Sequence, residues 1–455
     1  MKAPLSLLAS IALFGLTCPL LADEGTGSPS AQWPQWRGPD ASGIAPQARP
    51  PVEWSEAKNL RWKVKLPGKG TSTPIIWGDK IFLTTAMPKE GDSASPATAT
   101  AAPNEAPSGR RGGGGMRSEA PTIPYKFVVL CLDRKSGKTL WETTTTEVVP
   151  HEGHHQDHGF ASHSAITDGK LVYAYFGSRG IHCLDMNGKI LWSKSLGKME
   201  TRNGFGEGSS PVLAGDALVI NWDHEGEDFI VALDKRTGTE LWRKQRDEPT
   251  SWATPLAVTH DGKTQIIVNA TNRIRSYDLA NGNVLWECGG MTTNAIPTPL
   301  LSEGLVFVAS GFRGNALKAI KLGHTGDLTD TEAVAWSYDT KTPYVPSPIA
   351  YQGRLYFFSQ NTGMLTVLEA KTGKVLVDAE RIPGLSGVYA SPVAANDCIY
   401  LTGRNGSVVV LKAADKVEII ATNVLDEKFD ASPAVVGGEL YLRGHEYLYS
   451  VGEAR

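Results

Sequence analysis

The sequence predicts an all-β fold: an eight-bladed β-propeller made of four-stranded antiparallel blades. The first observation is a repeated unit, seen most clearly from Ser209 to Trp242. It contains four short β-branched and aromatic runs, separated by turns such as Gly215-Asp216 and Thr237-Gly238. Runs and turns of this kind are typical of strands in a meander. One unit therefore corresponds to one blade.

The second observation is the regular start of each unit, where a hydroxyl residue or a proline precedes a proline. These prolines are Pro74, Pro211, Pro255, Pro299, Pro348, Pro392 and Pro433, and Ser164-Ala165 is an equivalent without proline. Pro211, Pro255 and Pro299 follow one another at intervals of 44 residues. A four-stranded blade needs about 40 to 50 residues, and the 3.6-residue spacing of helical repeats is absent. The sequence thus predicts eight blades.

The third observation concerns closure of the ring. The last unit begins at Asp430 and supplies SPAVV, ELYLR and YLYSV, but no fourth strand. Asn59 to Lys65 (NLRWKVK) has the apolar-Trp pattern of a fourth strand and precedes the first unit. We expect this N-terminal strand to complete the last blade, which removes the open edges of the meander. The propeller is then predicted to span residues 59–455.

The first 22 residues predict export. Lys2 precedes the apolar run LSLLASIALFGL, and Ala22 precedes an acidic pair, as expected of a signal peptide cleaved after Ala22. Export to the periplasm or outside the cell follows. Lipidation at Cys18 is a less favoured alternative because Thr17 replaces the usual small residue, and an uncleaved anchor is another. No later segment approaches the length of a membrane span.

Two further segments lie outside the repeats. Residues 23–58 form an N-terminal arm with the motif WPQWRGP from Trp33 to Pro39, whose rings we expect to anchor it on the propeller rather than contact a ligand. Residues 87–124 interrupt blade 1 between its second and third strands. They are rich in Ala, Pro, Ser and Gly, which predicts a disordered loop.

Composition narrows the function classes. Lys plus Arg number 45 against 48 Asp plus Glu, a net charge of -3, which gives no argument for nucleic acid. The mature chain keeps Cys131, Cys183, Cys288 and Cys398 without a CxxC motif, and Cys131 and Cys183 are interpreted as packed thiols. We expect a monomer.

A signature of the form LD-x-x-TG-x-x-x-W adds a family resemblance. It ends at Trp141, Trp192, Trp242 and Trp286, and it resembles the repeat of the pyrroloquinoline-quinone (PQQ) type propellers. That superfamily includes quinoprotein alcohol dehydrogenases and the BamB-like outer-membrane assembly factors. The resemblance covers about the whole mature chain. TRNGFGEGSSP, NWDHEG, TSWATP, GFRGNA and YVPSP also look like secreted planctomycete propellers. Many of the dehydrogenases carry an adjacent Cys-Cys pair over the cofactor, and this chain has none.

Topology predicts one functional face. In a meander, the connection between the second and third strands lies on the same face as the start of the first strand, here called the mouth face. Its second connections supply Arg179, Asp223, His224, Asn272, Arg273, Arg313, Asn361, Arg404, Asn405 and His445. Residues near the first strands add His158, His163, Glu207, Trp252, Asn294, Tyr344, Tyr389 and Asp430. These side chains predict a ligand-binding funnel, although polar axes and turn preferences alone are an alternative explanation.

A histidine-rich segment, HEGHHQDHGFASHS, is the other candidate. It contains His151, His154, His155, His158 and His163, residues that favour transition metals. No carboxylate and histidine pair has helical spacing, so a solvated or hydrogen-bonding role is preferred. We predict no metal site.

The primary functional hypothesis is a non-catalytic, exported binding or scaffold protein of the cell envelope, similar to the assembly-factor branch. An envelope protein or a small ligand would bind at the funnel, without a cofactor. The alternative is a PQQ- and calcium-dependent dehydrogenase in which Glu207, Asp223 or Asp430 serves as base or ligand. A WD-type scaffold is disfavoured because its Gly-His and Trp-Asp marks are missing.

Overall fold

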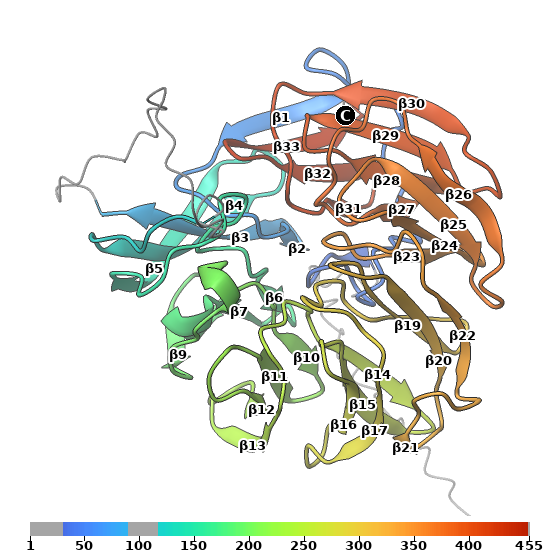
Figure 1. Cartoon of the computed structure of the whole chain (residues 1–455). Coiled ribbons are helices and arrows are strands. Elements are labelled where there is room, and N and C mark those ends of the chain that lie inside the picture. Colours follow the sequence, from blue (N-terminus) through green and yellow to red (C-terminus); the bar gives the residue numbers. More distant parts are fainter. Residues whose placement is uncertain (1–30, 90–116, 454–455) are drawn as a thin grey trace, which may run out of the picture.

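Eight sheets, seven of four strands and one with an added fifth strand, stand around a common axis and form an eight-bladed β-propeller, as predicted (Figure 1). This computed structural model describes residues 31–89 and 117–453. The predicted signal peptide, Cys18 and most of the 87–124 insertion lie outside the described residues. None of the described helices has the length and apolar character needed to cross a membrane.

Each blade runs from an innermost strand at the axis to an outermost strand at the rim. Blade 1 consists of β2 (Ile75–Trp77), β3 (Lys80–Pro88), β4 (Tyr125–Asp133) and β5 (Thr139–Val148). Blade 2 consists of β6 (Ile166–Thr167), β7 (Leu171–Tyr175), β8 (Ile181–Asp185) and β9 (Ile190–Lys194). Blade 3 consists of β10 (Val212–Ala214), β11 (Ala217–Trp222), β12 (Phe229–Asp234) and β13 (Glu240–Gln245). Blade 4 consists of β14 (Leu256–His260), β15 (Lys263–Val268), β16 (Ile274–Asp278) and β17 (Val284–Cys288).

The second half repeats this arrangement. Blade 5 consists of β18 (Leu300–Ser302), β19 (Leu305–Ser310), β20 (Ala316–Lys321) and β22 (Val334–Tyr338). Blade 6 consists of β23 (Ile349–Tyr351), β24 (Arg354–Phe358), β25 (Met364–Glu369) and β26 (Val375–Arg381). Blade 7 consists of β27 (Val393–Ala395), β28 (Cys398–Thr402), β29 (Ser407–Lys412) and β30 (Ile419–Val424). Blade 8 consists of β31 (Ala434–Val436), β32 (Glu439–Arg443), β33 (Tyr447–Gly452) and β1 (Leu60–Lys65). Two short 3-10 turns, η2 (Gly177–Arg179) and η3 (Arg202–Gly204), lie in connections.

Burial falls from the axis to the rim. Every residue of β11 is buried, whereas β13 alternates exposed and half-buried positions. Inner strands are covered by neighbouring blades on both faces and therefore read as continuous apolar runs. Outer strands face solvent on one side and alternate with the period of two that a pleated strand imposes.

The N-terminal strand closes the ring. β1 pairs antiparallel with β33, with Val64 opposite Leu448 and Lys65 opposite Tyr447. The buried carboxylate of Glu439 in blade 8 forms ion pairs with Arg61 of β1 and with Arg134 of blade 1. The closing strand is thus held by backbone bonds within its own blade and by charge across the junction to the next, and the predicted closure is confirmed.

Signature tryptophans latch one blade to the next. The indole of Trp192 in blade 2 donates a hydrogen bond to the carbonyl of Lys235 in blade 3, at 3.1 Å. Its ring covers Gly238, where an added Cβ would lie only 2.7 Å from the ring, so glycine is needed for this approach. The same indole-to-carbonyl bond is made by Trp62, Trp141, Trp242 and Trp336.

Blade 4 departs from this pattern. Its tryptophan, Trp286, is buried and donates to Gln265 in its own blade. The next blade has a longer third connection, and within it β21 (Gly326–Asp327) pairs parallel with β17 as a fifth strand. An added strand therefore occupies the rim where the usual latch would form.

A ring of hydroxyl groups surrounds the axis at the residues that precede the prolines. The backbone amide of Ser164 donates to the hydroxyl of Ser210 in the next blade at 3.0 Å, and Ser210 donates to Thr254 in the same way. The bond recurs from Thr73 to Ser164, Thr298 to Ser347, Ser347 to Ser391 and Ser391 to Ser432. The repeated hydroxyl-proline step thus links neighbouring innermost strands.

The latch on the closing strand gives a stability prediction. Trp62→Ala removes a half-buried indole that bonds Arg134 and covers Gly137 of blade 1. We expect it to lower the free energy of unfolding by about 2–3 kcal/mol. Lys65→Ala on the same strand, an exposed position, should change it by less than about 0.5 kcal/mol. Denaturant unfolding measures both, and equal stability of the two variants would contradict the latch.

Candidate functional site

The N-terminal arm lies across the axis at the face opposite the mouth face. Figure 1 shows this blue segment at the middle of the ring. Trp33 is fully buried and exchanges backbone hydrogen bonds with Ile76 of blade 1. Further along, the arm exchanges backbone bonds with Ala394 of blade 7 through Gly43 and Ala45. Because it is bonded to innermost strands on both sides of the ring, the arm closes this end of the axis.

Above the arm, a cavity of about 960 Å³ opens on the mouth face; we call it the funnel. Trp36 of the arm and the ring hydroxyls Ser164, Ser210, Thr254, Ser391 and Ser432 belong to its lining. The funnel is therefore a cup with one opening rather than a channel through the disc.

The funnel wall combines three kinds of side chain. Aromatic rings come from Trp36, Phe205, Trp252, Phe312, Tyr344 and Tyr389. Amides come from Gln156, Asn203, Asn294 and Asn361. Arg117, Arg202 and Arg313 bring guanidinium groups, and within the described part of the chain none of the three lies within ion-pair distance of a carboxylate.

The structure brings together about half of the predicted site residues. His158, Trp252, Asn294, Arg313, Tyr344, Tyr389 and Asp430 all line the funnel, as does Asn361. Phe312 stacks on Tyr344 with ring centroids 5.0 Å apart, and the guanidinium of Arg313 lies 5.3 Å from the Phe312 ring. These residues form an aromatic and cationic wall on blades 5 and 6.

Arg179, Glu207 and His163 lie outside the lining, behind the wall on blades 2 and 3. Arg179 and Glu207 form a buried ion pair at 2.9 Å, and Glu207 also accepts hydrogen bonds from the amide and hydroxyl of Ser178. His163 is buried against the ring of Tyr175. Arg179 and Glu207 are thus committed to each other, and none of the three residues belongs to the lining that a ligand would meet.

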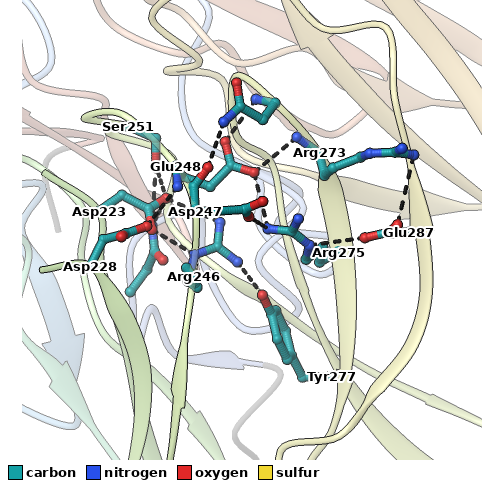
Figure 2. A network of polar contacts seen from close by, with 12 residues as sticks. Asp223, Asp228, Arg246, Asp247, Glu248, Ser251, Arg273, Arg275, Tyr277 and Glu287 are labelled. Carbon is teal, nitrogen blue, oxygen red and sulfur yellow. Dashed lines mark hydrogen bonds and ion pairs between the residues drawn. The ribbon is translucent and has the colours of Figure 1, made fainter. Parts of the chain in front are cut away.

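Asp223, Asn272 and Arg273 belong to a polar network between blades 3 and 4, outside the lining (Figure 2). Arg246 and Asp223 have no solvent exposure and form an ion pair at 2.6 Å. Asp223 also accepts a bond from Ser251 at 2.6 Å, and the arginine contacts Tyr277. This network neutralises Asp223 internally.

The same network extends outward through Glu248. Its carboxylate accepts bonds from the backbone amides of Asn272 and Arg273 and from the guanidinium of Arg275. Burial outweighs these donors and raises the pKa of Glu248 to about 7. The side chain of Arg273 turns to Asp327 at 2.9 Å. His224 is likewise committed, since its ring bonds the carbonyl of Glu227.

Arg404 does not line the funnel itself, but it binds two carboxylates that do. It forms ion pairs with Asp430 at 2.6 Å and with Asp157 at 2.7 Å, and it covers the ring of Tyr389 at 4.0 Å. Asp157 comes from the histidine-rich connection before blade 2, so this contact ties that connection to blade 7. The two carboxylates that line the funnel therefore share one cation.

The histidine-rich segment makes hydrogen bonds rather than a cluster. His151 bonds the carbonyl of Met199, and His154 bonds that of His155. His158 contacts Ser162 at 2.9 Å and the carbonyl of Glu207 at 2.9 Å. Burial lowers the pKa of His158 to about 4. Across residues 31–89 and 117–453, no three His, Cys, Asp or Glu side chains are arranged to hold a metal ion.

Sequence reasoning missed several lining residues. Trp36 was assigned only an anchoring role, yet within WPQWRGP it is Trp33 that is buried and Trp36 that faces the funnel. Phe205, Arg202 and Phe312 lie in TRNGFGEGSSP and GFRGNA, runs noted above only for their family resemblance. Aromatic and basic residues between glycines on the mouth face were the available signal.

Comparison with known proteins identifies related sequences and folds. The family model described as outer membrane protein assembly factor BamB matches residues 126–376, more than half of the chain. BamB of Shewanella oneidensis is 21% identical over 229 residues, which cover 50% of this chain and 42% of the relative. BamB of Francisella salina is 26% identical over 208 residues, covering 42% and 37%. The chain thus spans about two fifths of the length of these relatives.

Solved structures agree on the fold. BamB from Moraxella catarrhalis has a TM-score of 0.54 at 14% identity, covering 86% of this chain and 99% of its own. Quinohemoprotein alcohol dehydrogenase from Comamonas testosteroni has a TM-score of 0.60 at 11% identity, covering 94% and 82%. At such identities the likeness shows the fold alone.

The buried pair in Figure 2 predicts a stability effect for Asp223. Asp223→Ala leaves Arg246 buried without its carboxylate, and we expect a loss of about 3–5 kcal/mol in the free energy of unfolding. Asp216→Ala, which removes an exposed partner of Arg236, should cost less than about 1 kcal/mol. Chemical denaturation distinguishes them. An Asp223→Ala protein as stable as the wild type would contradict the stabilising role of this ion pair.

The buried imidazole of His163 predicts acid sensitivity. Desolvation lowers its pKa from 6.5 to about 3, so between these values the unfolded chain binds a proton that the folded chain does not. Stability from this residue is complete above pH 6.5 and falls as the pH drops, by about 3 kcal/mol at pH 4. His163→Gln should flatten this slope in unfolding measured from pH 7 to 4. His324→Gln, on a surface connection, should keep the wild-type slope, and an unchanged slope in His163→Gln would contradict the assignment.

Proposed function

We propose a binding function for this chain, which belongs to the family of the outer membrane protein assembly factor BamB: it is an exported, non-catalytic protein of the cell envelope that holds a partner or ligand in the funnel. The observation that carries the proposal is the composition of the funnel wall. Three guanidinium groups, which have no carboxylate partner in the described part of the chain, stand beside aromatic rings in a concave site with one opening. Concave sites with a few convergent polar groups are the usual places for recognition.

The lining also argues against acid-base chemistry. The hydrogen bond from Arg404 lowers the pKa of Asp157. Burial raises the pKa of Asp430, but hydrogen bonds with His445 and Arg404 outweigh burial and lower it, so both carboxyls stay ionised and occupied. Ser162 and His158 have the spacing of a nucleophile and base. However, the imidazole with a pKa of about 4 is a poor base at neutral pH, and its other nitrogen bonds a carbonyl oxygen instead of a carboxylate. Binding therefore fits this wall better than catalysis.

The dehydrogenase alternative has little support in the donor set. It assigns the role of base or calcium ligand to Glu207, Asp223 or Asp430, and each of these carboxylates is paired with an arginine. Calcium prefers six to eight oxygen ligands. The described residues offer no such set at the funnel, so the side chains do not fit a quinone-calcium centre and no step is derived through one.

Export and envelope partners complete the proposal. Relatives named as outer membrane assembly factors support an envelope location, which agrees with the signal peptide expected for residues 1–22. The periplasm is the compartment that fits such relatives best. A monomer suffices for this role, since the funnel is built from one chain. Lipidation at Cys18 remains the less favoured anchoring mode.

Affinity capture tests the funnel as the recognition site. Tagged protein is incubated with envelope extract of the producing organism, and captured proteins and small molecules are quantified by mass spectrometry. Arg202→Ala/Arg313→Ala should reduce the recovery of specific binders at least about tenfold, because charge-assisted bonds to both guanidinium groups are lost.

The matched control is Arg236→Ala, which removes an exposed arginine on the opposite face. It should capture the same set as the wild type. Unfolding curves of both variants should coincide with that of the wild type, since the lost side chains are at least partly exposed. If the double variant captures an unchanged set with unchanged yield, the funnel is not the binding site.

A further inference from the structure

We propose that the funnel binds the end of an acidic saccharide, a sugar chain that carries carboxylate or sulfate groups. This inference rests on the proposed binding function and names the chemistry of its ligand. Three features of the funnel support it: its charge, the hydroxyl, amide and aromatic side chains of its wall, and its closed floor.

The charged side chains of the funnel that have no ion-pair partner among the described residues are positive. Among the described residues, Arg117, Arg202 and Arg313 line it without carboxylate partners. Asp157 and Asp430 are held in ion pairs by Arg404, and Lys428 lies 3.9 Å from Asp157. A guanidinium group offers a planar fork of donors that matches the oxygens of a carboxylate or sulfate. The ligand is therefore expected to bring negative charge.

A fourth arginine lies just below the floor. Arg37 follows Trp36 in the arm, is 2% exposed, and bonds only the carbonyls of Ser42 and Pro348 through one terminal nitrogen. Its other two nitrogens are buried without partners among the described residues. Burial lowers the pKa of Arg37 to about 9, and the group stays charged at neutral pH. Because Arg37 adjoins the lining residue Trp36, its charge adds to the positive field at this end of the funnel.

The remaining wall suits a polyhydroxylated ring. Small hydroxyl and amide side chains dominate it, whereas Ile296 and Val345 are its aliphatic members. Hydroxyls and amides both donate and accept hydrogen bonds, as sugar hydroxyls require. The half-buried rings of Trp36 and Trp252 belong to the lining and offer flat apolar surfaces for the C–H faces of sugar rings. An acidic peptide would match the charge but would leave this density of hydroxyl groups unused.

The closed floor limits how the chain enters. With Trp36 at the bottom and one opening on the mouth face, a polymer is not threaded through the disc, so only a chain end is accommodated. A volume of about 960 Å³ holds a few sugar units. Asp157, tied to Arg404 and Tyr389, brings the connection before blade 2 to the mouth and narrows it on one side.

Titration calorimetry with defined probes tests the inference. The full-length exported protein is titrated with trigalacturonate, a sulfated galactose trisaccharide and neutral galactotriose, in low salt and at about 0.2 M NaCl. We expect the acidic sugars to bind at one site, at least tenfold tighter than the neutral sugar, and to weaken with salt. The two acidic probes tell a uronate from a sulfate ester as the recognised group.

Variants assign the contacts. Arg202→Ala/Arg313→Ala should weaken acidic sugars at least about tenfold and leave the neutral sugar unchanged, and Arg313→Lys should restore only part of the Arg313→Ala loss. Trp36→Ala should weaken acidic and neutral sugars alike, since it removes a stacking face. Arg236→Ala should bind as the wild type does.

Several results would overturn the inference. One is binding of neither acidic probe; others are preference for neutral sugar, or tighter binding of pentaglutamate or of PQQ than of trigalacturonate. If acidic sugars fail while Arg202→Ala/Arg313→Ala still loses captured partners, only the ligand class is wrong. If that variant also captures an unchanged set, the proposed function fails with it.

Discussion

A set of amide-to-hydroxyl hydrogen bonds around the axis, made at six of the eight junctions between blades, is the constraint on which the rest of the molecule depends. Each bond joins the start of one innermost strand to that of the next, as Ser347 donates to Ser391 at 2.9 Å. The following proline restricts the hydroxyl residue to an extended conformation. The step that repeats along the sequence is therefore also the step that fixes the spacing of the blades. Because hydroxyls such as Ser391 line the funnel, the same bonds set the radius of the site.

The N-terminal region closes the propeller in two ways. Leu60–Lys65 completes blade 8, and the arm before it seals the axis through backbone bonds to Ile76 and Ala394. Closure of the ring and closure of the funnel floor thus come from one continuous segment. The two tryptophans of WPQWRGP have different roles: Trp33 is buried and anchors the arm, and Trp36 faces the cavity. The segment that closes the ring therefore also contributes to the lining of the funnel.

The sequence predicted the fold better than the site because the fold signal is local and repeated. Seven hydroxyl-proline steps with one equivalent that lacks proline, a missing last strand and a spare first strand suffice to define a closed ring. Topology also placed residues such as Arg313 and Tyr344 on the correct face. It did not show that Glu207 and Asp223 turn away to Arg179 and Arg246, because ion pairs between residues of different connections leave no pattern in the sequence. The dual role of WPQWRGP was hidden for the same reason.

Pairing of buried charge explains which residues remain available for recognition. Burying a carboxylate without a partner raises the free energy of the folded state, so Glu207, Asp223 and Asp430 each form an ion pair with an arginine. These charges are therefore not available to a ligand. Arg313 at the rim of the funnel is exposed and solvated, so the free protein tolerates it without a counter-charge. An anion that binds there pairs with the guanidinium group of Arg313 and removes only part of its hydration, so the desolvation cost of binding is small. The free cations of the mouth are therefore better indicators of the ligand than the acidic residues that first drew attention.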